Sequence, residues 1–347
     1  MRPFTKFVIY PEPFWFRVFF FMVTTMAFEI NLLLFNFILP LLVATISLAG
    51  VNLLCGVRKG VWIPIASMLF LVSLMLAIGV SNSGQKFLEL SSDDPWRRLP
   101  WLVVLVGASE LLLQGVISLW SVRQAKSTSE RTEIGDGALV WLLRNSVLLG
   151  LGWWLVPRGE AWKDTAAMQS IWVLLFAQGA LWAWWGVSSI RRYSRESVDA
   201  VDIQSGKGTL WRLWIVIGPL LVMVAIAGQS FASLAESLLT LSAIGLGMVI
   251  ASWRSKNPLV SIWGESVLAA ALAGGTVMAM TYSSSSVPAW SYWVILLVPV
   301  VVTAMDALWR LWHLKMLYRL LLAAVVTASL LAFIVVQVIA NQPAENW

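Results

Sequence analysis

The chain has 347 residues, of which 59% are hydrophobic and only 12% are charged. Soluble domains have roughly 45–50% apolar and about 25% charged residues, whereas the mean hydropathy here is +0.80. These values exclude a water-soluble globular protein and a disordered one, and the net charge of +6 points to anionic lipid headgroups, not nucleic acid, as the partner of the basic loops.

The apolar residues fall in blocks of the length that a membrane span needs, about 20 residues for ~30 Å of hydrocarbon. The first block, residues 14–57, is too long for one span, and we expect it to cross twice with a tight turn near Phe35 and Asn36. Nine further spans are predicted at 61–81, 99–122, 138–156, 167–190, 209–229, 231–252, 259–282, 290–309 and 317–340.

This pattern predicts an all-α, polytopic transmembrane helix bundle of about eleven spans with short loops, in one membrane domain of residues 1–347. Ten spans are the alternative, with residues 14–28 as a helix on the membrane surface. Residues 99–150 also superpose on 170–221 as span, basic loop and span, with Trp101 on Trp172 and Gly115 on Gly186. A duplicated hairpin and a chance likeness between two hairpins both explain this register.

The basic residues predict the orientation, because Lys and Arg accumulate in cytoplasmic loops. Alternate loops place fifteen of them on one face and five on the other. We therefore expect eleven spans with the N-terminus inside and the C-terminus outside, in a bacterial inner membrane. The 22 tryptophans gather near the span ends, as expected for indoles at the headgroup level.

Scarce residue types exclude several kinds of site. The single cysteine, Cys55, cannot form an intramolecular disulfide, and the single histidine, His313, cannot supply bis-histidine haem ligation. No GxxxxGK[ST] segment is present to hold a nucleotide phosphate. We therefore expect no cofactor and no metal cluster.

Ionisable residues within the predicted spans are the candidate functional residues, since a charge at the centre of a span costs about 2.5–3.5 kcal/mol. Glu110 lies near the middle of its span, and Arg144 in the next span is a candidate partner for an intramembrane ion pair. Four further carboxylates lie nearer the span ends, at Glu29, Glu236, Glu265 and Asp306. Together the carboxylates predict a ladder for a proton or cation, although those near the ends would also suit helix capping.

Helix breakers and small residues predict two local features. Among the prolines inside spans (Pro40, Pro64, Pro219 and Pro299), the Gly218-Pro219 pair is the best candidate for an interrupted helix. Small residues at Gly245, Gly247, 269–271 and 273–275 predict close packing of the spans that begin at 231 and 259.

Three functions remain open. A secondary transporter that uses an ion gradient fits the span count, the carboxylates and the broken helices. A non-catalytic subunit of a larger membrane complex fits the small loops, which suggest partner subunits. A membrane enzyme acting on lipid-linked substrates ranks third and would need loop carboxylates such as Asp93 and Asp94, so we favour a protein that is not an enzyme.

Overall fold

The computed structural model describes residues 30–57, 63–81, 98–124, 146, 207–230, 232–253, 259–282, 288–312 and 314–340. The described part is helical apart from short turns and contains no strand, which confirms the all-α prediction. Its elements are η1 (Leu34–Ile38), α2 (Leu39–Val57), α3 (Ile63–Gly79), α5 (Arg98–Gln124), α9 (Lys207–Ser230), α10 (Ala232–Ser252), α11 (Leu259–Tyr282), α12 (Ala289–Leu311) and α13 (Met316–Ala340). The seven helices from α3 onward end within two residues of the predicted bounds. The predicted spans 138–156 and 167–190 lie outside the described residues, apart from position 146.

The first described helix corrects the predicted turn at Phe35 and Asn36. The chain is helical without a break from Ile30 through η1 and α2, so that turn is wrong. Residues 34–38 instead form a π-helical turn, in which the Leu39 N–H donates to the Leu34 carbonyl five residues earlier. Pro40 explains the turn, because it has no N–H and its ring crowds the carbonyl of Asn36.

The interruption predicted at Gly218-Pro219 is also wrong. Helix α9 continues through Pro219. The neighbouring Gly218 lies close to α13, where an added Cβ would be 3.3 Å from Leu331 and 3.5 Å from Thr327. This glycine therefore serves close packing of two helices.

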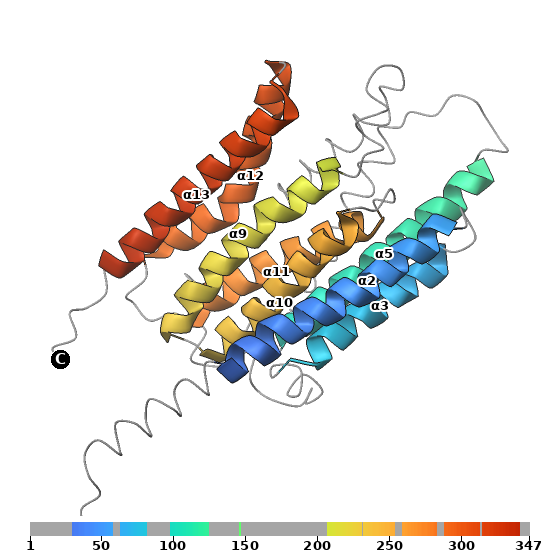
Figure 1. Cartoon of the computed structure of the whole chain (residues 1–347), viewed down its shortest axis with the longest axis horizontal. Helices are drawn as coiled ribbons and strands as arrows, with labels where there is room; N and C mark the ends of the chain where they lie inside the picture. Colours follow the sequence, from blue (N-terminus) through green and yellow to red (C-terminus); the bar gives the residue numbers. More distant parts are fainter. Residues whose placement is uncertain are drawn as a thin grey trace, which may run out of the picture.

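The helices form one bundle with alternating directions (Figure 1). Helices α2 and α10 run parallel, because Ala44 packs on Gly247 and Asn52 contacts Ala251. The two helices therefore end at the same side of the bundle, where α9 and α11 begin and where α12 and α13 are joined. We call this side the basic end, because the sequence continues there with Arg-Lys after α2 and with Arg254 and Lys256 after α10.

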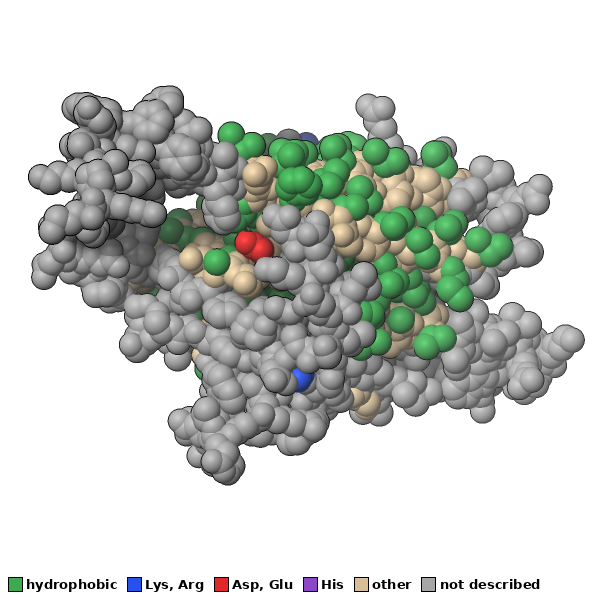
Figure 2. All heavy atoms as spheres, turned by 90° about the horizontal axis from the view of Figure 1, so that it is seen from below, with side chains coloured by type: hydrophobic (Ala, Val, Ile, Leu, Met, Phe, Trp, Pro, Cys, Tyr) green, Lys and Arg blue, Asp and Glu red, His purple; other side chains and the backbone are tan. Residues whose placement is uncertain are grey.

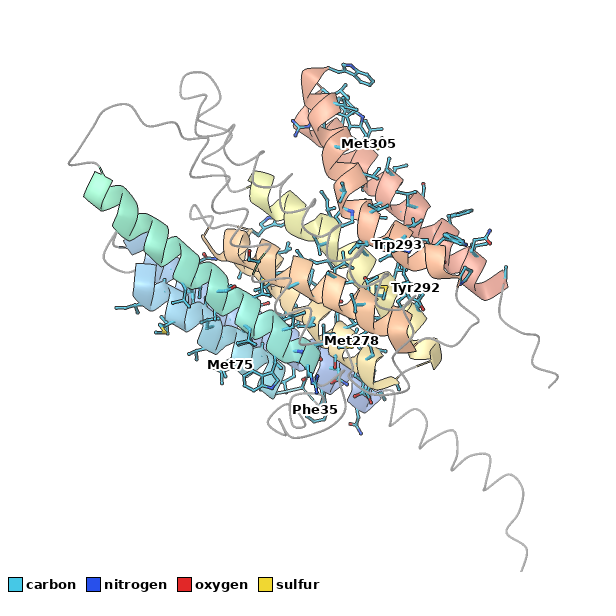
Figure 3. The ribbon with its side chains drawn as sticks, turned by 180° about the vertical axis from the view of Figure 1, so that it is seen from behind. Phe35, Met75, Met278, Tyr292, Trp293 and Met305 are labelled. Atoms are coloured by element: carbon cyan, nitrogen blue, oxygen red, sulfur yellow. The ribbon has the colours of Figure 1, made fainter. Side chains whose placement is uncertain are left out.

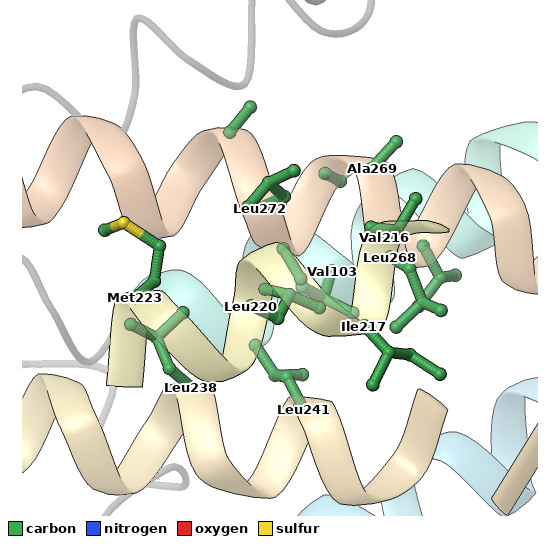
Figure 4. Close-up of a cluster of buried hydrophobic side chains, with 14 of the residues drawn as sticks. Val103, Val216, Ile217, Leu220, Met223, Leu238, Leu241, Leu268, Ala269 and Leu272 are labelled. Carbon is green, nitrogen blue, oxygen red and sulfur yellow. The ribbon is translucent and has the colours of Figure 1, made fainter. Parts of the chain in front are cut away.

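The core is built from aliphatic side chains at positions where glycine lets helices approach. Figure 4 shows Ile217 and Leu220 of α9 between α11, with Leu268 and Leu272, and α10, with Leu238 and Leu241. An added Cβ on Gly245 would lie 2.8 Å from Leu268, and one on Gly275 would lie 2.5 Å from Leu238. The predicted close packing of α10 on α11 is confirmed, whereas Gly247 faces α2 instead.

Apolar side chains also cover the outside of the bundle. Leu53 and Leu112 are each 72% exposed and Met68 is 69% exposed, and the described part of the face in Figure 2 is mainly hydrophobic. Water-soluble proteins rarely expose apolar patches of more than a few hundred Å². Two described helices, Ile30–Leu53 and Ala232–Ser252, are long and apolar enough to cross a membrane. The count of eleven spans stays a prediction.

Candidate functional site

The structure describes the predicted ionisable residues to different extents. Glu29 and Arg144 lie outside the described residues, so the Glu110–Arg144 ion pair stays a prediction. The backbones of Glu110, Glu265 and Asp306 are described, in α5, α11 and α12. Glu236 is half-buried in α10, one turn after the helix begins. Asp93 and Asp94, and most of the predicted repeat, also lie outside the described residues.

Two of these positions lie level with each other on neighbouring helices. An added Cβ on Gly107 of α5 would lie 3.3 Å from Val267 of α11, and the two helices run in opposite directions (Figure 1). Glu110 lies three residues after Gly107 in α5, and Glu265 lies two residues before Val267 in α11. Because the helices run in opposite directions, both steps go toward the same end of the bundle, so the two positions lie at a similar level. Two residues correspond to about 200° around a helix, so position 265 lies on the side of α11 away from α5. The structure does not bring these two positions together.

A line of buried residues along η1 and α2 contains a different set of polar residues. Asn36, Pro40, Ala44, Leu48 and Asn52 recur at every fourth position, and each of them is buried. Ala44 packs on α10 at Gly247, and the Asn52 side-chain nitrogen donates to the Ala251 carbonyl at 3.1 Å. Asn36, the buried residue of η1 and fully inaccessible, lies on the same stripe, and η1 contacts α10.

The matching face of α10 is also polar. Glu236, Thr240, Gly247 and Ala251 are spaced by four, seven and four residues, so they share one side of the helix. Thr240 is 1% exposed, and its hydroxyl donates to the Glu236 carbonyl at 3.0 Å. Gly247 on this face brings the backbones close, since an added Cβ would lie 3.1 Å from the Thr45 nitrogen and 3.2 Å from the Leu41 carbonyl oxygen.

The contact between Ala44 and Gly247 sets the level of the remaining residues. Asn36 lies two turns before Ala44, and Thr240 lies two turns before Gly247. Because the helices are parallel, Asn36 and Thr240 lie at the same depth, about 10–12 Å from that contact. Figure 3 labels the adjacent Phe35 of this turn, away from the basic end of the bundle. We call the interface the seam, defined by Asn36, Thr45 and Asn52 on η1 and α2 and by Glu236, Thr240, Gly247 and Ala251 on α10.

Two buried oxygens of the seam have no hydrogen-bond partner in the described part of the chain: Thr45 Oγ1 and Asn52 Oδ1. The Ser252 hydroxyl is also unpartnered there, but Ser252 lies seven residues after Gly245, on the face of α10 that meets α9 and α11. The Asn52 amide nitrogen donates to the Ala251 carbonyl, so the amide oxygen Oδ1 is the atom of this side chain that is left without a partner. Leaving a buried polar group unpaired costs about 1–3 kcal/mol. A further unpartnered hydroxyl, that of Ser291, lies in the first turn of α12.

Other hydroxyls in the bundle are satisfied within their own helices. Those of Ser47, Ser73, Ser242 and Thr276 donate to the carbonyl four residues earlier, at 2.6–2.8 Å. That bond is the usual solution for a hydroxyl in an apolar helix. The unpartnered oxygens of the seam depart from this rule at an interface between two helices, where a bound ion or water can contact both sides.

The seam extends along most of the bundle. Fifteen residues separate Glu236 from Ala251, the residue whose carbonyl accepts from Asn52, and this corresponds to about 22 Å along α10. Oxygen atoms therefore recur from near one end of an apolar bundle to near the other. Asn36 and Asn52 are sixteen residues apart in an apolar run, about four and a half turns, and Pro40 follows Asn36 by four residues, which is the local sequence signal for this stripe. The partner face on α10 has no local signal, because almost 200 residues separate the two helices.

The chain was compared with protein-family models, with curated proteins and with solved structures, and none of the three comparisons finds a match.

Proposed function

We propose that the chain is a secondary transporter that moves a small cation or a proton along the seam, driven by an ion gradient. The observation that supports this most is the presence of the unpartnered oxygens of Thr45 and Asn52 in α2, the helix that packs on the polar face of α10. Buried polar groups inside a membrane domain typically mark ion pathways. A single π-helical turn within an α-helix, such as η1, is frequently found at a functional site.

A membrane location is part of this proposal. It is supported by the exposed apolar surface of the bundle and by the two helices long enough to cross a bilayer. Because residues 30–57 are one helix, we favour ten spans over eleven, with the segment before Ile30 outside. The C-terminus is then also outside.

The basic end faces the cytoplasm in this proposal. The helix ends followed by Arg58, Lys59, Arg254 and Lys256 lie on the same side of the bundle, in agreement with the preference of basic loops for the inside. Each cation near the surface contributes about 1 kcal/mol of attraction to anionic headgroups. A bacterial inner membrane supplies such lipids. The exposed indoles of Trp253 and Trp312 at this end suit the headgroup level.

Flux measurements test the proposal directly. We expect purified chain in sealed proteoliposomes to carry a cation or proton current when a Na⁺, K⁺ or pH gradient is imposed. Thr45→Val and Asn52→Leu remove oxygens of the seam while keeping side-chain size, so each should lower the flux at least about tenfold. Thr276→Val is the matched control, because its hydroxyl bonds within α11, and it should keep the wild-type rate.

Other outcomes would separate the remaining functions. Vesicles that carry no current under any gradient, while the chain purifies in a fixed ratio with other polypeptides, would contradict transport and favour a non-catalytic subunit. Equal losses in Thr45→Val and Thr276→Val would remove the seam as the pathway.

A further inference from the structure

We propose that the first turns of α9 and α11, together with the Ser252 hydroxyl at the end of α10, form a binding site for one phosphate group at the basic end of the bundle. The phosphate group belongs either to free inorganic phosphate or to the headgroup of an anionic lipid, and a titration with each distinguishes the two sources. The site lies on another side of α10 than the seam, so the inference goes beyond the proposed function and does not depend on ion transport.

Ser252 lies in the last turn of α10, on the face that meets α9 and α11. It follows Gly245 by seven residues, close to two full turns, so the two residues share one face of the helix. An added Cβ on Gly245 would lie 2.8 Å from the Leu268 side chain of α11 and 3.3 Å from the Ile217 side chain of α9. The Ser252 side chain therefore enters the space between these two helices.

The same contacts place Ser252 level with the first turns of both neighbouring helices. Helices α9 and α11 begin at the basic end, where α10 ends, so both run opposite to α10 (Figure 1). Seven residues onward from Gly245 therefore correspond to seven residues back from each of its two contacts, at Leu210 and Ser261. Leu210 is the fourth residue of α9 and Ser261 is the third residue of α11. Ser252 thus lies between two helix N-termini.

The hydroxyl of Ser252 is the observation that indicates a ligand. The residue is 4% exposed, and its Oγ has no hydrogen-bond partner in the described part of the chain. The buried hydroxyl of Ser242 in the same helix instead donates to the Leu238 carbonyl at 2.8 Å. The Ser252 hydroxyl can therefore donate its hydrogen to a bound group.

The two N-termini favour an anion as that group. The first N–H groups of a helix have no acceptor within the helix and form the positive end of its dipole, and phosphate groups commonly bind there. Neither first turn contains an acidic residue that would neutralise this end. Lys207 begins α9, and Arg254 and Lys256 follow α10 in the sequence.

The C-terminus of α10 lies beside these N-termini, and hydrogen bonds reduce its negative potential. The Ala251 carbonyl accepts from the Asn52 side chain at 3.1 Å, and the Ile250 carbonyl accepts from the Trp253 N–H at 3.2 Å. Two positive helix ends therefore outweigh one partly satisfied negative end. A tetrahedral phosphate fits this arrangement, because its several oxygens can accept hydrogen bonds from three helices at once.

Calorimetric titration of the purified full chain in a non-ionic detergent measures the binding. Potassium phosphate is the first probe, with potassium chloride keeping the ionic strength constant, and short-chain phosphatidylglycerol is the second. We expect saturable binding of one inorganic phosphate per chain. Ser252→Ala should raise the Kd about tenfold, because it removes a hydrogen bond to a charged group. The variant should remain folded, since the hydroxyl that it loses has no partner within the protein.

The matched control is Ser242→Ala, which removes a buried hydroxyl of α10 that already has an acceptor and should leave the Kd unchanged. Inorganic phosphate binding that Ser252→Ala weakens and Ser242→Ala does not would support a site for free phosphate. The same pattern with phosphatidylglycerol alone would assign the phosphate group to a lipid headgroup. Binding of neither probe, or equal Kd values in wild type and Ser252→Ala, would overturn the site. None of these results requires flux, so the site and the transporter can fail independently.

Discussion

Thr45 illustrates at the residue scale how a functional group can oppose stability. Its backbone nitrogen lies at the α2–α10 contact, and its hydroxyl is buried without a partner among the residues that the structure describes. The buried hydroxyl of Thr276 instead donates to the Leu272 carbonyl at 2.6 Å. Valine has nearly the same shape as threonine. We therefore expect Thr45→Val to stabilise the protein by about 1 kcal/mol, because it removes an unpaired polar group, and to raise the unfolding temperature in detergent.

Thr276→Val provides the comparison for this prediction. It removes a hydroxyl that is already satisfied, so the free energy of unfolding should fall slightly, by about 0.5 kcal/mol, or stay unchanged. A Thr45→Val protein that unfolds at a lower temperature than Thr276→Val would show that the Thr45 hydroxyl has a stabilising partner. Higher stability with lower flux in Thr45→Val would instead be the trade-off that functional sites commonly show.

At the scale of helices, Gly247 decides how closely α2 and α10 approach. A Cβ on Gly247 would lie 2.8 Å from the Ala44 Cβ and 3.1 Å from the Thr45 backbone nitrogen. Backbone atoms cannot rotate away as a leucine tip can. We expect Gly247→Ala to separate the helices and to destabilise the protein by about 1–3 kcal/mol, measured by thermal or denaturant unfolding in detergent.

Two other glycines provide comparisons for the loss of stability expected in Gly247→Ala. No atom lies within 4 Å of a Cβ added to Gly50 in α2, so Gly50→Ala should be neutral or stabilising through helix propensity. At Gly275 the nearest atom is the end of the Leu238 side chain, which can move, so Gly275→Ala should cost less than Gly247→Ala. Equal effects at Gly50 and Gly247 would show that the two helices are not held at this distance.

The sequence predicted most helices well because a long apolar run is a local signal. The seven helices from α3 onward agree within two residues. The error at Phe35 and Asn36 has a physical cause: the length of block 14–57 suggested a turn, whereas a π-turn absorbs Pro40 within one helix. Likewise, Pro219 leaves α9 continuous, so a proline alone does not locate an interruption.

For the molecule as a whole, the seam could not be predicted, because it depends on which helix faces meet across a long stretch of chain. Charged residues such as Glu110 can be identified as candidate functional residues from the sequence alone, because burying a charge in a membrane is costly. Asn36, Thr45 and Asn52 are neutral and give no such signal. Only the parallel packing of α2 and α10 reveals that their oxygens lie along one interface with Thr240 and Glu236.

The direction of α10 allows the proposed orientation of the whole molecule to be tested. Ser233 lies exposed in the first turn of α10, and Trp253 follows its last turn with 65% of its surface exposed. In a Cys55→Ala background, we expect a membrane-impermeant maleimide added to intact cells to label Ser233→Cys and not Trp253→Cys. Inside-out vesicles should show the reverse, because the basic end faces the cytoplasm. Labelling of both cysteines from one side would mean that α10 does not cross the membrane, and reversed labelling would place the basic end outside.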